Sequence, residues 1–135
     1  MGTFACKPEY SVSVSILDTQ HKRLFTLAQA LQDAMSAERD RDVLTRCLGE
    51  LIDYAKIHTL EEESLLINYD YADLVQHRFE HLQLVNNISD FQQQFTSGKG
   101  SLTAEFLDII KNSMINHILQ IDMRYADFFN KLGVY

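Results

Sequence analysis

Apolar residues recur every three or four positions along four stretches of the chain, which is the period of an α-helix with one buried face. The stretches span residues 18–37, 41–67, 71–95 and 102–129. The single proline, Pro8, precedes all of them, so proline interrupts none of these segments. Asp18 stands where the N-cap of the first helix is expected. The pattern predicts an all-α protein.

The first 17 residues have a different pattern. The segment YSVSVSIL alternates apolar and polar side chains and is rich in β-branched residues, which favours an extended arm that packs on the helices. Four helices joined by short loops favour an antiparallel up-down-up-down four-helix bundle. We therefore expect one domain, with an N-terminal arm at 1–17, the bundle at 18–129 and a C-terminal tail at 130–135.

Side chains that can bind a metal interrupt the apolar faces of these helices. The second helix carries His-x-x-x-Glu, the third His-x-x-x-His and the fourth His-x-x-x-x-Asp, and a lone histidine lies near the start of the first. The full set is His21, His58, Glu62, His77, His81, His117 and Asp122. In an antiparallel bundle all of them lie ~5 to 16 Å from the same end, at ~1.5 Å per residue. We expect them to converge, which uses every histidine of the chain.

Asp122 fits this arrangement least well. It follows His117 by five positions, which corresponds to a rotation of about 140° around an α-helix. A carboxylate that reaches between two metal ions can tolerate this offset. Each motif alone also has a simpler interpretation, because a single inward histidine is usually a hydrogen-bonded core residue and i, i+4 pairs are common on helices.

The complete set favours a metal centre, because five histidines and two acids buried without a metal would be a costly cluster of desolvated polar groups. Zinc prefers four ligands, and calcium and magnesium prefer oxygen. A mixed set of this size suits two non-haem iron ions, with manganese as the nearest alternative. Two bridging carboxylates, five imidazoles and an oxo or hydroxo bridge fill all but one coordination position of two octahedral irons. That position could bind a small diatomic ligand.

Four stretches, SVSVSILDTQHKRLF, HTLEEESLL, HRFEHL and NHILQIDMRY, resemble the hemerythrin family in its bacterial branch, over nearly the whole chain. The resemblance implies that His77, His81 and His117 are terminal ligands of the saturated iron, and that His21 and His58 are those of the iron with the open position. It implies that Glu62 and Asp122 bridge the two. The implied function is the binding of O2, held as hydroperoxide, for storage, delivery or sensing.

The same resemblance implies an oxygen pocket that includes Leu24, Thr59, Ser113, Met114 and Ile118. Thr59 stands where the family usually has phenylalanine, and Ser113 where tryptophan is common. Cys6, Ser13 and Ala72 are further departures from the family pattern. Loss of the two rings predicts a roomier, wetter pocket and fast autoxidation, unless another side chain fills the space. The alternative function is therefore a di-iron redox enzyme or a sensor that acts on O2, peroxide or nitric oxide.

Composition excludes several other classes of function. The chain of 135 residues has a net charge of −7 and lacks a cluster of lysine and arginine, which argues against nucleic acid and anionic membranes as partners. It shows neither a secretory signal nor an apolar run near the ~20 residues of a membrane span. We expect a cytoplasmic binding protein rather than an enzyme, with Cys6 and Cys47 as ordinary thiols. The sequence does not indicate a protein partner.

Overall fold

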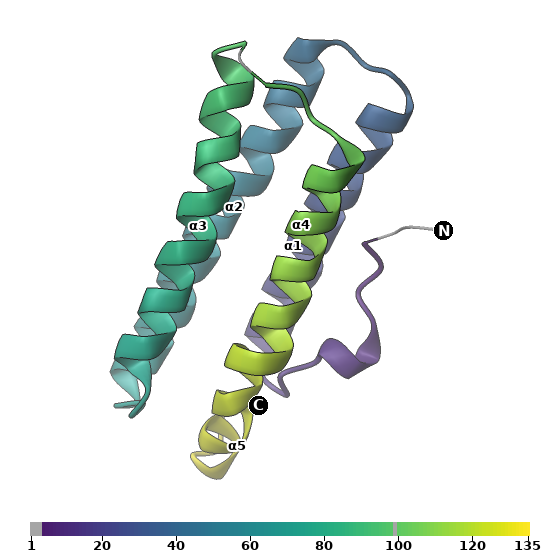
Figure 1. Cartoon of the computed structure of the whole chain (residues 1–135). Coiled ribbons are helices and arrows are strands. Elements are labelled where there is room, and N and C mark those ends of the chain that lie inside the picture. The colour runs from purple at the N-terminus through teal and green to yellow at the C-terminus, as the bar shows by residue number, and fades with distance from the viewer. Residues whose placement is uncertain (1–3, 99) are drawn as a thin grey trace.

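The structure of the chain is a computed structural model that describes residues 4–98 and 100–135. In this described part, four long helical segments run alternately up and down, and consecutive segments pack side by side (Figure 1). The first three are α1 (Ser15–Ser36), α2 (Arg41–Asn68) and α3 (Leu74–Thr96). The fourth consists of α4 (Ala104–His117), the π-helical turn η2 (Ile118–Asp122) and α5 (Met123–Lys131). The predicted all-α, up-down-up-down bundle is confirmed.

Side-chain caps explain where two of the helices begin. The carboxylate of Asp40 accepts a hydrogen bond from the Val43 backbone N–H (3.0 Å) at the start of α2. The hydroxyl of Thr103 accepts one from the Phe106 N–H (3.2 Å) at the start of α4. Each cap satisfies a backbone donor that the first turn of a helix leaves without a partner.

The prediction that Asp18 caps the first helix is wrong, because α1 begins three residues earlier, at Ser15. Asp18 lies in the first turn and accepts hydrogen bonds from the Ser11 hydroxyl (2.6 Å) and the Val12 backbone N–H (2.8 Å). A negative charge is favourable at this end of a helix. The carboxylate therefore fastens the N-terminal arm to α1.

The arm packs along α1, as the alternating pattern predicts. It contains one short 3-10 helix, η1 (Pro8–Tyr10), and buries Phe4, Tyr10, Val12 and Val14. The ring of Tyr10 stacks on that of Phe25, with 5.7 Å between the ring centres. Ser13 adopts a left-handed backbone with φ of 59°, a conformation that glycine adopts more readily.

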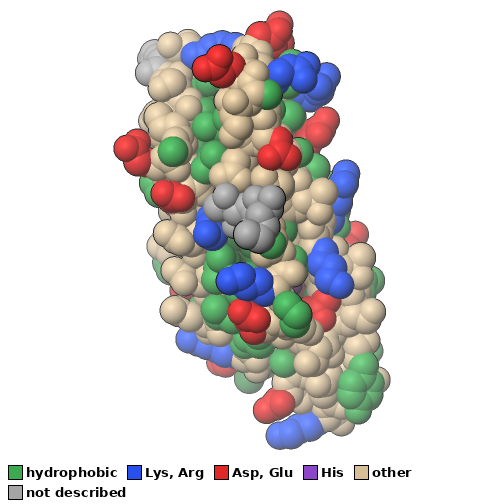
Figure 2. All heavy atoms as spheres, turned by 90° about the vertical axis from the view of Figure 1, so that its right-hand side faces the viewer, with side chains coloured by type: hydrophobic (Ala, Val, Ile, Leu, Met, Phe, Trp, Pro, Cys, Tyr) green, Lys and Arg blue, Asp and Glu red, His purple; other side chains and the backbone are tan. Residues whose placement is uncertain are grey.

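The apolar core runs between the helices, and the metal-binding residues lie toward one end of it. Fully buried core side chains come from the first, second and fourth helical segments: Leu17, Leu31, Leu48, Ile52, Leu66, Ile110, Tyr125 and Phe129. Helix α3 adds the buried ring of Phe95. Lysine, arginine and acidic side chains are scattered over the face shown in Figure 2, with both signs interspersed. Among the described residues, no helix is both long and apolar enough to span a bilayer.

Candidate metal centre

The structure places all seven predicted metal-binding side chains in one buried cluster. They come from the start of α1, the end of α2, the start of α3 and the region around η2, which meet at the same end of the bundle (Figure 1). Both carboxylates are fully buried, and the histidine side chains are between 2% and 10% exposed. Their ligand atoms form two groups within each of which all atoms lie within 4.8 Å of one another. The first group is His77, His81, His117, Glu62 and Asp122; the second is His21, His58, Glu62 and Asp122.

The two carboxylates belong to both groups, and each directs one oxygen toward each group. Glu62 Oε1 lies 2.6 Å from His77 Nε2 and 2.9 Å from His81 Nε2. Its other oxygen, Oε2, lies 3.4 Å from His58 Nε2 and 3.6 Å from His21 Nε2.

Asp122 repeats this division. Its Oδ1 lies 3.1 Å from His77 Nε2 and 3.0 Å from His117 Nε2, while its Oδ2 lies 3.2 Å from His21 Nε2. The arrangement is that of two adjacent cation sites joined by two carboxylates.

Most of these atoms are close together without being aligned for hydrogen bonds. Among the described residues, both oxygens of Asp122 and the Nε2 atoms of His21, His81 and His117 lack a hydrogen-bond partner, although they are buried. Buried polar groups without partners are costly and rare in folded proteins. The imidazole nitrogens and carboxylate oxygens point toward the same small volumes rather than toward hydrogen-bond partners. This is the arrangement expected of metal ligands, so the donor set fits the two cations that the sequence predicts.

A π-helical turn explains how Asp122 reaches the cluster. The predicted continuous α-helix over residues 102–129 is wrong in this segment, because Ile118–Asp122 forms η2. A π-helix has a wider turn, closed by i→i+5 hydrogen bonds. Five residues therefore come close to one turn, and Asp122 lies on the same side as His117 instead of about 140° away. Turns of this kind occur frequently at functional sites.

Sequence reasoning missed three residues that contact the cluster from outside. His58 Nδ1 donates a hydrogen bond to the amide oxygen of Gln20 (2.6 Å), and His81 Nδ1 donates one to the carboxylate of Glu63 (2.8 Å). These bonds place the ring proton on Nδ1 and leave Nε2 free as a ligand atom. The Tyr125 hydroxyl donates to Glu62 Oε2 (2.8 Å). Gln20 and Glu63 are each adjacent in sequence to a predicted ligand, and this adjacency was the signal by which the sequence could have indicated them.

The electrostatics of the cluster show strong attraction between its acids and bases. Burial lowers the pKa of His21, but the carboxylates of Asp122 and Glu62, whose oxygens lie 3.2 Å and 3.6 Å from its Nε2 atom, outweigh this effect and raise the pKa to about 10. The same balance raises the pKa of His77 to about 9. Burial raises the pKa of both carboxyl groups, yet the surrounding histidines bring both below their ordinary values. Metal binding at this cluster would therefore release protons from the imidazoles.

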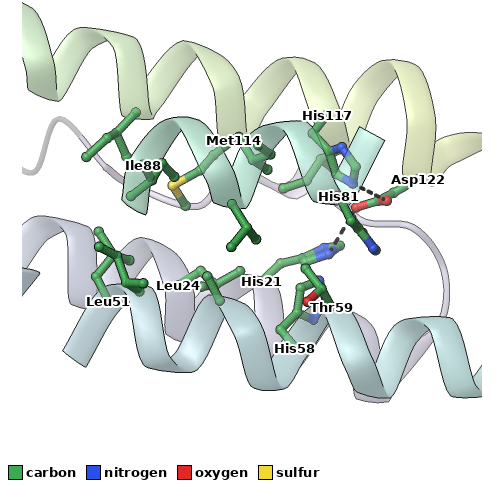
Figure 3. A pocket seen from close by; sticks show the side chains of 16 residues that line it. His21, Leu24, Leu51, His58, Thr59, His81, Ile88, Met114, His117 and Asp122 are labelled. Atoms are coloured by element: carbon green, nitrogen blue, oxygen red, sulfur yellow. Dashed lines mark ion pairs between the residues drawn. The ribbon is translucent and has the colours of Figure 1, made fainter. Parts of the chain in front are cut away.

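A cavity of about 50 Å³ extends from the cluster into the apolar core (Figure 3). His21, His58, His81, His117 and Asp122 line its polar end. Four predicted pocket residues, Leu24, Thr59, Met114 and Ile118, also line it.

Ser113 does not line this cavity, contrary to the prediction. It lies in a separate surface groove between α3 and α4, because Met114 is the residue of α4 that points inward at this level. The predicted effect of losing two aromatic rings therefore depends on Thr59 alone.

The fold and the cluster define the class of this molecule, a helical-bundle protein with a buried histidine and carboxylate cluster that could hold metal ions. Comparisons with known proteins identify the family. The family model of the hemerythrin HHE cation binding domain matches residues 12–129. The chain belongs to the hemerythrin family.

Individual relatives agree with this assignment. A bacteriohemerythrin from Methylococcus capsulatus is 31% identical over 118 residues, which cover 87% of this chain and 89% of that protein. A bacteriohemerythrin from Clostridium acetobutylicum is 27% identical over 128 residues, which cover 92% of this chain and 99% of that protein. A crystal structure of wild-type hemerythrin superposes with a TM-score of 0.81 at 30% identity, covering 86% and 88% of the two chains. The crystal structure of a mutant of hemerythrin superposes with a TM-score of 0.88 at 28% identity, covering 94% of this chain and 97% of that one.

Proposed function

We propose that this protein binds O2 reversibly at a non-haem di-iron centre held by the seven-residue cluster, for storage, delivery or sensing. The observation that carries the proposal is the division of the two carboxylates, which offer one oxygen to each of two adjacent cation sites beside an apolar cavity. Membership of the hemerythrin family supports iron as the metal. Two ferrous ions would supply electrons and an open coordination position for O2.

The chain's own residues favour one half of the cluster for the ligand. The half with His21 and His58 has one histidine fewer than the other half, and both of its histidines border the cavity, whereas His77 of the other half does not. The open position is therefore expected on this side. Gln20 holds the His58 ring by its Nδ1 atom, and Tyr125 fixes the orientation of Glu62. These contacts preorganise the ligands before a metal or O2 binds.

The walls of the cavity favour binding over turnover. Apart from the proposed ligands, the described residues that line the cavity are aliphatic, methionine or Thr59. The Thr59 hydroxyl donates to the Lys56 carbonyl (2.9 Å), so it is already engaged. Catalysis of O2 reduction needs a positioned proton donor. We therefore propose a binding protein rather than an enzyme.

The test is the visible spectrum of iron-quantified protein that is reduced without air, exposed to O2 and then purged. We expect a charge-transfer band that appears with O2 and disappears on purging, at about two irons per chain. Asp122→Asn should lower the iron content, whereas Asp127→Asn, at an exposed position of α5, should not. Irreversible conversion to an oxidised spectrum would contradict reversible binding. Manganese instead of iron in the purified protein would contradict the metal assignment.

A second candidate is a redox sensor or redox enzyme that acts on O2, peroxide or nitric oxide. Thr59 favours it, because this small, partly exposed side chain separates the cavity from a surface groove. Water that passes it would promote oxidation of the reduced centre. Sustained turnover with an electron donor would support an enzyme. A protein partner whose binding depends on the oxidation state would support a sensor.

A further inference from the structure

The internal cavity and an outer groove share a wall. The groove, about 460 Å³ in volume, lies on the surface between α2 and α3. Three residues, Thr59, His81 and Val85, line both the groove and the cavity. These side chains are reached from inside and from outside, so the wall at this place is one side chain thick. Figure 3 shows Thr59 and His81 at the end of the cavity where the metal cluster lies.

The three residues of this wall differ in how firmly they are held. The His81 ring is 3% exposed and is fixed by Glu63 at one nitrogen, while its other nitrogen faces Glu62. Thr59 and Val85 are short, β-branched and partly exposed. Within residues 4–98 and 100–135, the one hydrogen bond of the Thr59 side chain goes to a carbonyl of its own helix. Rotation of such partly exposed side chains takes picoseconds to nanoseconds. The movable part of the wall is therefore Thr59 and Val85.

The surface outside this wall suits an apolar molecule. Leu60, Phe79 and Leu82 line the groove and are 65%, 51% and 58% exposed, and the charged side chains that also line it are Lys56, Glu63 and Arg78. Apolar solutes move favourably from water to apolar surfaces. A small apolar gas is therefore enriched directly in front of Thr59.

We propose that the ligand enters and leaves the cavity from the α2–α3 groove, through the wall at Thr59 and Val85. The inference rests on the proposed function for the identity of the ligand, a small apolar gas such as O2. The wall acts on passage, so it sets how fast the ligand associates and dissociates. The wall makes no contact that favours the bound ligand over the free one, so a substitution that changes only the rate of ligand passage leaves the affinity unchanged.

A second groove offers the natural comparison. It lies between α3 and α4 and borders the cavity at Leu84 and His117. Its other lining residues are mostly amides and charged side chains, such as Gln83 and Arg124. This polar surface gives an apolar gas no advantage over water. Substitutions there serve as the matched control.

The experiment compares side chains truncated at the two grooves. Thr59→Ala and Val85→Ala open the wall, and Gln83→Ala removes a side chain of the other groove; alanine preserves the helix in all three. Stopped-flow mixing of the reduced, iron-loaded proteins gives the rates of O2 association and dissociation. We expect each wall variant to increase both rates by the same factor, about tenfold if the barrier falls by about 1.4 kcal/mol. Gln83→Ala should leave both rates unchanged.

Xenon exchange, followed by 129Xe magnetic resonance on the oxidised, iron-loaded protein, reports passage without any oxygen chemistry. The wall variants should accelerate it and Thr59→Phe should slow it. Unchanged xenon exchange in both alanine variants would overturn the entry route, as would an equal acceleration by Gln83→Ala. If xenon exchange responds as expected but O2 does not bind reversibly, the entry route stands and the proposed function fails.

Discussion

Removal of the metal should reverse the response of this protein to pH. In the metal-free protein the folded state holds a proton on His21 up to a pKa of about 10, whereas the unfolded chain releases it near the ordinary histidine pKa of 6.5. Stability from this proton is complete below pH 6.5 and is lost progressively as the pH rises toward 10. The pKa values of the Glu62 and Asp122 carboxyl groups are lowered, so these groups act in the opposite pH range. Their contribution to the stability of the protein is lost as the pH falls below about 4.

The magnitude on the alkaline side follows from the shifts. A rise from 6.5 to about 10 for His21 corresponds to about 5 kcal/mol, and a rise from 6.5 to about 9 for His77 to about 3 kcal/mol. Both histidines contact the same two carboxylates, so the contributions overlap and the combined loss is about 5 kcal/mol. That loss is comparable to the whole stability of an ordinary domain, about 5 to 15 kcal/mol.

The assay is urea unfolding followed by helical circular dichroism at about pH 5.5, 7 and 8.5, with and without two equivalents of iron. The free energy of unfolding of the metal-free protein should fall steeply across this range. In the loaded protein the metal replaces these protons, so the free energy should not fall above neutrality and should fall in acid instead. His21→Gln should flatten the metal-free profile. A metal-free stability that is constant or rises between pH 6.5 and 8.5 would refute the reasoning.

Three further outcomes are expected. Glu63→Gln replaces the carboxylate beside His81 with a neutral amide. This variant should bind iron about 10- to 100-fold more weakly in a chelator competition, and an unchanged affinity would contradict the prediction. Thr59→Phe should slow autoxidation, whereas Ser113→Trp alone should not, because Ser113 lies outside the cavity. The decay of the spectrum of the reduced, oxygenated protein measures both rates. Slower autoxidation in the single variant Ser113→Trp would refute this placement. Deletion of Gln120 should convert the π-helical turn into ordinary α-helix and reduce the separation of the η2 carboxylate from His117 to four residues, about 40° around the helix, so iron should be retained; loss of iron with unchanged helical content would show that the wide turn itself is needed to position the carboxylate.

The helices were predictable because their apolar period is strong and extends over many turns. The observed ends lie within a few residues of the predicted ones, and the misplaced start of α1 has a local cause, since the Asp18 carboxylate accepts hydrogen bonds from the arm rather than from its own helix. The convergence of His58, Glu62, His77 and His81 followed from i, i+4 spacing and antiparallel order, which geometry alone determines.

The errors concentrate around η2, where the sequence carries no propensity signal. Beyond this turn Phe129 is fully buried, while its neighbour Phe128 is only partly buried. The single hint was the five-residue spacing from His117 to Asp122, which conflicts with α-helical geometry. Packing at this site overrides the local period. Ser113 was misplaced because helical spacing alone leaves its neighbour Met114 equally able to point inward.

The distribution of the cluster over all four helical segments has a consequence for folding. Its members extend from His21 to Asp122, so the cluster exists only when contacts distant in sequence have formed. Such contacts form late in folding, so a partly folded chain would bind iron poorly. In the folded protein, detachment of any one helix would open the centre. The rate at which a strong chelator removes iron under native conditions would then report the spontaneous detachment of the most weakly held helix.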